Sequence, residues 1–242
     1  MRIFANCLEM HNEVGRDLHE MGTIVHPETM QDKDVRGNDD YTTLELSPYD
    51  FMIIDAGDRN DLITKLGLSL QWCFSDFDER VSSELINPGE AWKARRETWE
   101  PFIHDGKFAY TYNERINMRV HKPGVFAPVS ALDRIIEELG KNPNTRQAIL
   151  PIFCAPYDLG SLGGVARVPC SLHYQFAIRD GELRMFYVMR SSDFATHFAY
   201  DIWMATRLQL YVANQLNIKL GRFAFFTGSL HLYKKDWDSR TF

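Results

Sequence analysis

The chain has 242 residues, of which 45% are hydrophobic and 25% charged, values typical of a soluble globular protein of one large or two small domains. Its net charge of −6 gives no electrostatic reason to expect binding to nucleic acid or to a membrane. No apolar run approaches the roughly 20 residues that span a bilayer. The four cysteines lack the spacing of metal ligands, so we predict a cytoplasmic chain with free thiols and no metal site.

The first half of the chain predicts two helices and a long polar loop. Cys7–Met21 can form a helix, and His26–Tyr41, rich in Asp, Asn and Gly, is typical of a long loop. Apolar residues at helical spacing favour a second helix over Asp61–Phe74. Pro88–Gly106 mixes aromatic and charged residues, and no element is assigned to it.

The second half predicts both helices and strands. The clearest helix is Ser130–Gly140, in which Ser130 can cap the start and Gly140 the end. The elements expected after it are a buried strand Gln147–Phe153, a hairpin of Ser171–Ile178 with Glu182–Met189, a long helix Ala199–Leu216 and a short strand Arg222–Phe226. The hairpin signal is the dipeptide Asp180-Gly181. Interleaved helices and antiparallel strands favour an α+β fold in one domain.

Cys170 is distinguished from an ordinary buried cysteine by its neighbours. It directly precedes the first hairpin strand, and Arg190, Ser191 and Asp193 follow the second. Because a hairpin returns the chain to its start, Arg190 can lie near Cys170 and favour the reactive thiolate. Arginine with serine also suits a phosphate group. The alternative is a structural ion pair between Arg190 and Asp193.

Further motifs complete a resemblance to a known family. They are Pro169-Cys170, the hairpin, Arg190-Ser191-x-Asp193, Asp201 and Gly228-Ser229-Leu230-His231-Leu232-Tyr233. Taken in this order they resemble the thymidylate synthase superfamily, including its deoxycytidylate hydroxymethylase branch. The match is dense from Asn142 to Tyr233. It implies one thymidylate-synthase-like domain over residues 1–242, with a mixed sheet, packed helices and a homodimer formed through the sheet face.

The resemblance also implies roles for individual residues. Cys170 is the expected nucleophile toward C6 of a pyrimidine nucleoside monophosphate. The expected nucleotide contacts are Arg190 and Ser191 at the phosphate, Asp193 and Asp201 at the base, and His231 and Tyr233 at the sugar. Arg146, in the segment Asn142–Arg146, is expected to reach the phosphate of the partner protomer. Trp99 and Tyr112 resemble the tryptophan and tyrosine of the folate pocket, with Tyr112 near the chemistry and Trp99 against the co-substrate.

The residue at position 201 predicts the base. A protonated aspartic acid donates to N3 of cytosine and accepts from its amino group, whereas uracil presents the reverse pattern and suits the asparagine of uracil-specific members. Asp201 therefore favours cytosine; the alternative is that Asp201 only caps the helix that begins near it.

Covalent addition explains why a thiol is needed. A thiolate at C6 makes C5 nucleophilic toward an activated one-carbon unit, which the resemblance implies comes from methylenetetrahydrofolate. Water then gives a hydroxymethyl product and hydride a methyl product. The first hypothesis is a cytidylate or deoxycytidylate 5-hydroxymethyltransferase in the cytoplasm, of a host cell if a phage encodes it. The alternatives are a pyrimidine C5-methyltransferase, such as a divergent thymidylate synthase, and a nucleotide-binding homologue without catalysis.

Several features depart from the family pattern. Ser69 stands where the family has a glutamate as general base, and a serine cannot relay protons as a carboxylate does, so Glu45 or another acid is expected to reach the site. Met189 replaces a polar residue before Arg190. The sequence stops nine residues after Tyr233, at Phe242, so we expect a more open folate site that favours water over hydride. Arg36 matches a phosphate arginine only loosely, and we expect a solvated turn there.

Overall fold

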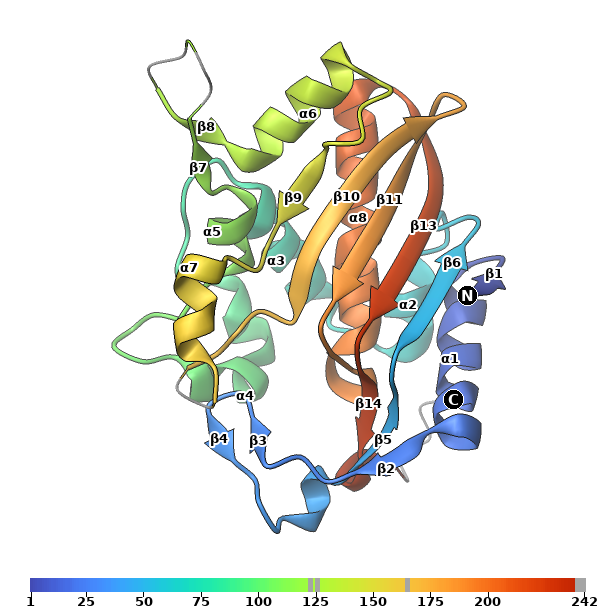
Figure 1. Ribbon diagram of the computed structural model, residues 1–242, viewed down its shortest axis with the longest axis vertical. Helices are drawn as coiled ribbons and strands as arrows, with labels where there is room; N and C mark the ends of the chain where they lie inside the picture. Colours follow the sequence, from blue (N-terminus) through green and yellow to red (C-terminus); the bar gives the residue numbers. More distant parts are fainter. Residues whose placement is uncertain (122–123, 125–126, 164–165, 238–242) are drawn as a thin grey trace.

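The computed structural model of the chain describes residues 1–121, 124, 127–163 and 166–237. Its interleaved helices and strands confirm the α+β prediction (Figure 1). The larger sheet runs in the order β1 (Arg2–Phe4), β6 (Tyr49–Ile53), β13 (Lys219–Thr227), β11 (Glu182–Met189), β10 (Ser171–Arg179) and β9 (Ile149–Pro151). The smaller sheet runs in the order β12 (Ser192–Asp193), β14 (Leu230–Tyr233), β5 (Thr43–Leu46) and β2 (Thr23–Val25). Short ribbons pair β3 (Thr29–Met30) with β4 (Lys33–Asp34) and β7 (Arg119–Val120) with β8 (Val129–Ser130).

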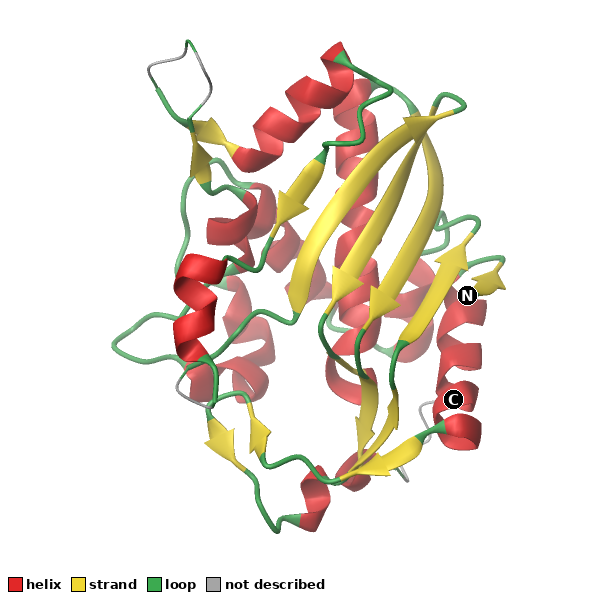
Figure 2. Ribbon diagram, in the orientation of Figure 1, coloured by secondary structure: helices red, strands yellow, loops and turns green. Residues whose placement is uncertain are grey.

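The helices gather on one side of the larger sheet. They are α1 (Cys7–Met21), α2 (Asn60–Leu66), α3 (Leu70–Val81), α4 (Arg96–Trp99), α5 (Tyr112–Ile116), α6 (Ala131–Lys141), α7 (Ala155–Asp158) and α8 (Ala199–Leu216). In Figure 2 they lie behind or beside the sheet, whose near face is left uncovered. The helix α8 packs against β11 and β13 and forms the centre of the covered side.

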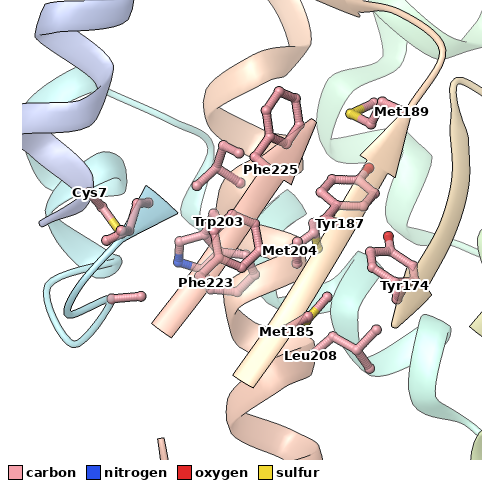
Figure 3. Packing of buried hydrophobic residues seen from close by; sticks show 14 of the residues in the cluster. Cys7, Tyr174, Met185, Tyr187, Met189, Trp203, Met204, Leu208, Phe223 and Phe225 are labelled. Atoms are coloured by element: carbon pink, nitrogen blue, oxygen red, sulfur yellow. The ribbon is translucent and has the colours of Figure 1, made fainter. Parts of the chain in front are cut away.

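The core lies between α8 and the sheet because strand side chains alternate between two faces. The buried residues include Met185, Tyr187 and Met189 on β11, and Phe223 and Phe225 on β13. They meet Trp203, Met204 and Leu208 of α8 (Figure 3). Met189, the departure before Arg190, is therefore a core residue, 1% exposed. The opposite face carries large apolar side chains in the open, with Phe186 41% and Phe226 44% exposed.

The predicted hairpin forms and brings Cys170 to Arg190. The turn residues Asp180 and Gly181 both have positive φ, 56° and 74°, which is the conformation that a two-residue hairpin turn requires. At the other end the register of β10 shifts between Ser171 and His173, directly after Cys170. Such a bulge re-aims neighbouring side chains, and it lies beside Cys170.

Several predicted elements have different bounds in the structure; the last strand, expected over Arg222–Phe226, is the longer β13. The helix expected over Asp61–Phe74 is wrong, because Gly67, with φ 68°, ends α2 and Ser69 begins α3. The helix α6 is capped by Ser130 as predicted but continues through Gly140 to Lys141. The strand expected over Gln147–Phe153 shortens to β9, an edge strand whose first and last residues are exposed.

Two segments gained structure that their composition did not predict. The polar stretch His26–Tyr41 contains the β3–β4 ribbon and a 3-10 turn, Asp39–Tyr41. Within it Arg36 is exposed and pairs with Asp34, as expected of a solvated turn. Pro88–Gly106 contains α4 between two 3-10 turns, Ala91–Arg95 and Glu100–Phe102.

Candidate active site

A cavity of about 510 Å³ lies where the β3–β4 ribbon, α4 and the smaller sheet approach the Cys170 end of β10. That volume is within the range of small-molecule sites. All but one of the predicted site residues line it: Trp99, Tyr112, Cys170, Arg190, Ser191, Asp193, Asp201, His231 and Tyr233. The exception is Arg146, which is exposed in the turn before β9 and does not line the cavity of its own chain.

The hairpin fixes Arg190 against the segment that carries Cys170. The backbone N–H of Arg190 donates to the Cys170 carbonyl at 2.8 Å. Its guanidinium donates from Nε to the Pro169 carbonyl and from Nη2 to the Val168 carbonyl, both at 3.0 Å. The remaining nitrogen, Nη1, lies 3.2 Å from Ser191 Oγ, which itself lies 3.8 Å from Cys170 Sγ. Thiol, hydroxyl and guanidinium therefore share one wall, and the last two can hold an anionic group.

Asp193 and Asp201 have different structural tasks. Asp193 caps a turn of π-helix, Phe194–Phe198, by accepting from the backbone N–H groups of Ala195 and Thr196 at 3.1 and 3.2 Å. The carboxylate of Asp193 is therefore used for this cap, and the alternative predicted from the sequence, an ion pair with Arg190, does not form. Because Asp193 supplies the cap, Asp201 is free of that role and lies in the first turn of α8 with its carboxyl group lining the cavity.

The carboxyl group of Asp201 titrates near neutral pH. Burial raises its pKa to about 7, against the opposing effect of the Arg80 and Arg95 guanidinium groups. Its hydrogen-bond partner is the hydroxyl of Ser192, which donates to Oδ2 at 3.5 Å. An acid of this kind can either donate or accept within the cavity, according to the ligand.

His231 and Tyr233 share one face of β14, as their alternation predicts. Their rings meet edge to face with centroids 5.1 Å apart, and both line the cavity. Burial lowers the pKa of His231, so its imidazole is neutral. The Ser229 hydroxyl lies 3.3 Å from His231 Nδ1 and restrains the ring. The pair presents a phenol and a neutral imidazole, which suit hydroxyl groups of a ligand.

Tyr112 begins a buried chain of hydroxyl groups. Its Oη lies 2.9 Å from Ser171 Oγ, which lies 2.5 Å from Tyr187 Oη. The guanidinium of Arg80 stacks on the Tyr112 ring, 4.1 Å from its centroid, and is held by Asp76 through a 2.6 Å bond from Nε. The phenol at the cavity wall is therefore fixed from both its polar end and its face.

The wall near Trp99 is aromatic and carries unpaired donors. Trp99 stacks with Trp72 at 6.2 Å between centroids, and the Arg167 guanidinium lies 5.2 Å from the Trp99 ring. The buried N–H groups Trp99 Nε1 and Arg167 Nε have no partner among the described residues. A flat ligand with acceptor atoms fits this wall, because it would stack on the rings and pair with donors that are costly to leave unmet.

Ser69 has a structural role. Its Oγ accepts from the Trp72 N–H at 3.2 Å and thereby caps α3, and its own N–H donates to Tyr200 Oη at 2.8 Å. The carboxyl groups that do line the cavity belong to Glu45, Glu97, Asp193 and Asp201. Glu45 is one of them, as expected, and it stands opposite His231 in the β5–β14 ladder.

Sequence reasoning missed Arg80, Arg95, Arg167 and Gln31, all of which contribute to the cavity or to the groups behind it. The spacing of Asp76 and Arg80 is a helical ion-pair signal, but it does not reveal that the guanidinium faces inward, only 7% exposed. Gln31 lies in the stretch expected to be a loop and reaches Cys170 from 139 residues away.

The described residues, 1–121, 124, 127–163 and 166–237, hold no metal cluster and no membrane-spanning helix. No cluster of three His, Cys, Asp or Glu side chains there could hold a metal ion. No helix in the same ranges is long and apolar enough to cross a membrane. The expectation of a shortened C-terminal segment falls on residues 238–242, outside the described ranges.

Comparison with known proteins identifies the family. The family model for thymidylate synthase matches residues 82–241. A Methanosarcina barkeri protein named "Putative thymidylate synthase" is 28% identical over 228 residues, 92% of this chain and 94% of that one. Thymidylate synthase of Coxiella burnetii is 31% identical over 110 residues, 46% of this chain and 40% of that one.

Two solved structures share the fold. Thymidylate synthase A of Bacillus subtilis has a TM-score of 0.65 at 18% identity, over 95% of this chain and 80% of that one. The thymidylate synthase of phage T4 has a TM-score of 0.68 at 20% identity, over 94% and 77%. Because the family model matches well over half of its residues, this chain belongs to the thymidylate synthase family.

Proposed function

We propose that this protein transfers a one-carbon unit from methylenetetrahydrofolate to C5 of a cytosine nucleotide, dCMP or CMP, and releases the 5-hydroxymethyl product. The observation that carries the choice of base is Asp201, a buried carboxyl group in the cavity wall whose pKa is raised to about 7. A carboxyl group that holds a proton at neutral pH can donate to cytosine N3 and accept from the 4-amino group. Uracil would leave buried donors facing donors, which costs binding energy.

The chemistry follows from Cys170. Its thiolate adds to C6 of the ring, the C5–C6 double bond opens, and the electron pair moves to C5, which bonds to the one-carbon unit. Loss of the C5 proton and departure of tetrahydrofolate from the one-carbon unit give an exocyclic methylene at C5. Water adds to this methylene, and departure of the thiolate from C6 restores the C5–C6 double bond and releases the hydroxymethyl product. Tyr112, fixed at the wall by Ser171 and Arg80, is the hydroxyl group that we assign to proton handling.

The family uses methylenetetrahydrofolate as its co-substrate, which supplies the one-carbon unit when bound. The aromatic wall fits such a molecule, because a flat ring can stack on Trp99 while its acceptors meet the N–H groups Arg167 Nε and Trp99 Nε1. These residues bind and orient the ring system. They also exclude bulk water from one side of the cavity.

The remaining predicted residues complete a nucleotide site. Arg190 and Ser191 bind the phosphate, Asp193 orients the base pocket, and His231 with Tyr233 binds the sugar. We propose a homodimer formed through the uncovered sheet face, on which Phe186 and Phe226 are exposed. Arg146, absent from the cavity of its own chain, then reaches the phosphate of the partner.

A second candidate is C5 methylation, of dUMP or dCMP. The observation in its favour is that the relatives above carry the name thymidylate synthase. The third candidate is a homologue without catalysis, which Ser69 favours, because this position is used for capping a helix and presents no carboxylate.

One experiment separates the three. Tritium release from C5-labelled dCMP, CMP and dUMP is measured in the presence of methylenetetrahydrofolate, and the mass of the product is determined by mass spectrometry. Release from a cytosine nucleotide with a hydroxymethyl product is the expected result. Release from dUMP alone would contradict the argument from Asp201. The catalytically inactive homologue would be favoured by two negative results together. The wild-type protein would release no tritium, and its intact mass would show no covalent nucleotide adduct of the kind that Cys170→Ala should abolish.

A further inference from the structure

Gln31 contacts the thiol from the turn of the β3–β4 ribbon. Its Nε2 donates to Cys170 Sγ at 3.7 Å, and its Oε1 accepts from the Val168 backbone N–H at 3.3 Å. The orientation of the carboxamide is fixed by the second bond, because a backbone N–H can only donate and must face the oxygen. The nitrogen end is thereby directed at the sulfur.

The backbone at Gln31 is held in an unfavourable conformation. Its φ is 56°, a left-handed value that residues with a side chain adopt at a cost and that favours glycine or asparagine. The ribbon is anchored directly after this residue: Asp32 Oδ2 lies 3.6 Å from His104 Nε2, and Lys33 Nζ lies 4.9 Å from the centre of the Phe102 ring. Strain of this kind at a cavity wall persists where the side chain has a task that a glycine could not perform.

The chemical need at this point is a donor to sulfur. The thiolate is the reactive form of cysteine, and hydrogen bonds to an anion favour it. The guanidinium of Arg190 is turned to the Val168 and Pro169 carbonyls. The Ser191 hydroxyl and the Gln31 amide are the groups that reach Sγ, at 3.8 and 3.7 Å. Three phenols, those of Tyr110, Tyr112 and Tyr233, are close enough for the charge of the thiolate to add to the effect of burial, which is the main cause of their raised pKa values.

We propose that Gln31 is a positioning residue for Cys170: it donates a hydrogen bond to the thiolate and aims the sulfur into the cavity. The inference rests on the proposed role of Cys170 as nucleophile. The hydrogen-bond donor comes from the β3–β4 ribbon, which lies in the stretch that the sequence predicts as a loop. A neutral amide suits this role, because it stabilises the anion without adding a charge that would compete for the substrate phosphate.

The test measures alkylation of Cys170 by iodoacetamide without any nucleotide, followed by mass spectrometry of the Cys170 peptide at pH 6 to 9. Gln31→Glu keeps the size and the acceptor for Val168 but turns a carboxylate toward the sulfur. The alkylation rate at pH 7 should fall by about tenfold and recover at higher pH. Gln71→Glu, which adds the same charge at an exposed position on α3, should react like the wild type.

Gln31→Gly separates positioning from folding. It removes the amide and relieves the left-handed backbone, so the urea midpoint should stay equal or rise while alkylation slows. Equal alkylation rates for wild type and Gln31→Glu across the pH range, or equal slowing by Gln31→Glu and Gln71→Glu, would overturn the inference. The alkylation assay uses no nucleotide, so its outcome does not depend on turnover. If the wild-type protein released no tritium, the proposed function would be refuted, but the effect of Gln31 on the reactivity of Cys170 would still hold.

Discussion

Asp201 changes its charge in the neutral pH range, and the proposed pairing with cytosine needs one proton between the carboxyl group and N3. Because burial raises its pKa to about 7, turnover of the cytosine nucleotide should be highest below pH 7 and fall above it. Asp201→Asn should remove this fall and move the preference from dCMP to dUMP. Tritium release at pH 5.5 to 8.5 with both nucleotides measures the two effects. An unchanged base preference in Asp201→Asn would refute the pairing.

The same carboxyl group makes the stability of the folded protein depend on pH. The folded state binds the Asp201 proton more tightly than the unfolded state, so stability falls as pH rises from the unfolded value toward 7. The complete penalty is about 4 kcal/mol for a shift from 3.8 to about 7, at about 1.4 kcal/mol per pKa unit. Asp201→Asn should therefore gain more stability at pH 8 than at pH 5, as urea unfolding would show. Equal gains in the free energy of unfolding at pH 5 and pH 8 would show that Asp201 is not the source of the pH-dependent penalty.

Single residues also show where sequence reasoning stops. Cys170 and Arg190 could be paired from the sequence, because a short hairpin sets their separation. The contact of Gln31 with Cys170 could not be predicted, since it depends on how the β3–β4 ribbon, 139 residues away in the sequence, folds over the site. The inward direction of Arg80 likewise follows from the packing of α3 against α5.

At the scale of elements, Ser69 is assigned to the helix start and not to the chemistry. Its hydroxyl caps α3, and loss of such a cap costs about 1 kcal/mol. Ser69→Ala should lower the free energy of unfolding by about that amount and leave tritium release per folded protein unchanged. Ser69→Asp, which can also cap, should retain the stability. A large loss of turnover in Ser69→Ala at full folding would assign the hydroxyl to catalysis.

A buried ion pair joins α5 to α7. Arg115 Nη2 donates to Asp158 Oδ1 at 2.6 Å, with side chains 9% and 4% exposed, and Asp158 Oδ2 accepts from the Cys154 N–H at 2.6 Å. Arg115→Met would leave the carboxylate buried without its partner and should cost about 3–5 kcal/mol of unfolding free energy.

The matched control removes the remaining charge. Asp158→Asn added to Arg115→Met keeps an acceptor for the Cys154 N–H, so the double variant should recover most of the loss in a thermal or urea melt. A double variant as unstable as Arg115→Met would show that packing of the arginine, and not the unpaired charge, explains the cost.

The elements that sequence predicted well are those with local signals. The hairpin has its turn dipeptide, and α8 and α1 have long helical patterns, so their bounds agree with the structure. The break between α2 and α3 was missed because the apolar spacing continues across Gly67, and periodicity alone does not detect a left-handed glycine. The strand β9 is shorter than predicted because an apolar run shows neither where the pairing ends nor that the strand lies at a sheet edge.

At the scale of the whole molecule, the helices cover one face of the larger sheet and leave apolar side chains on the other. In the register of the sheet, Phe186 is next to Ala224, and Phe226 is next to Val188 and Asp50. An apolar, uncovered sheet face is a candidate interface, and two-fold pairing of identical chains is the commonest way to cover one. Arg146 lies in the turn before β9, the edge strand of this sheet, and faces solvent in the single chain.

A mixing experiment tests the dimer and the lent arginine together. Cys170→Ala and Arg146→Ala should each be nearly inactive, since each site lacks one group. In a mixed dimer the site with intact Cys170 receives intact Arg146 from its partner. Co-refolded equal mixtures should then regain about a quarter of the wild-type activity, because half the dimers are mixed and each has one complete site. Phe186→Glu, which places a charge on the uncovered face, should abolish the recovery when present in both chains. If Arg146 served its own chain, the mixture would stay as inactive as its components.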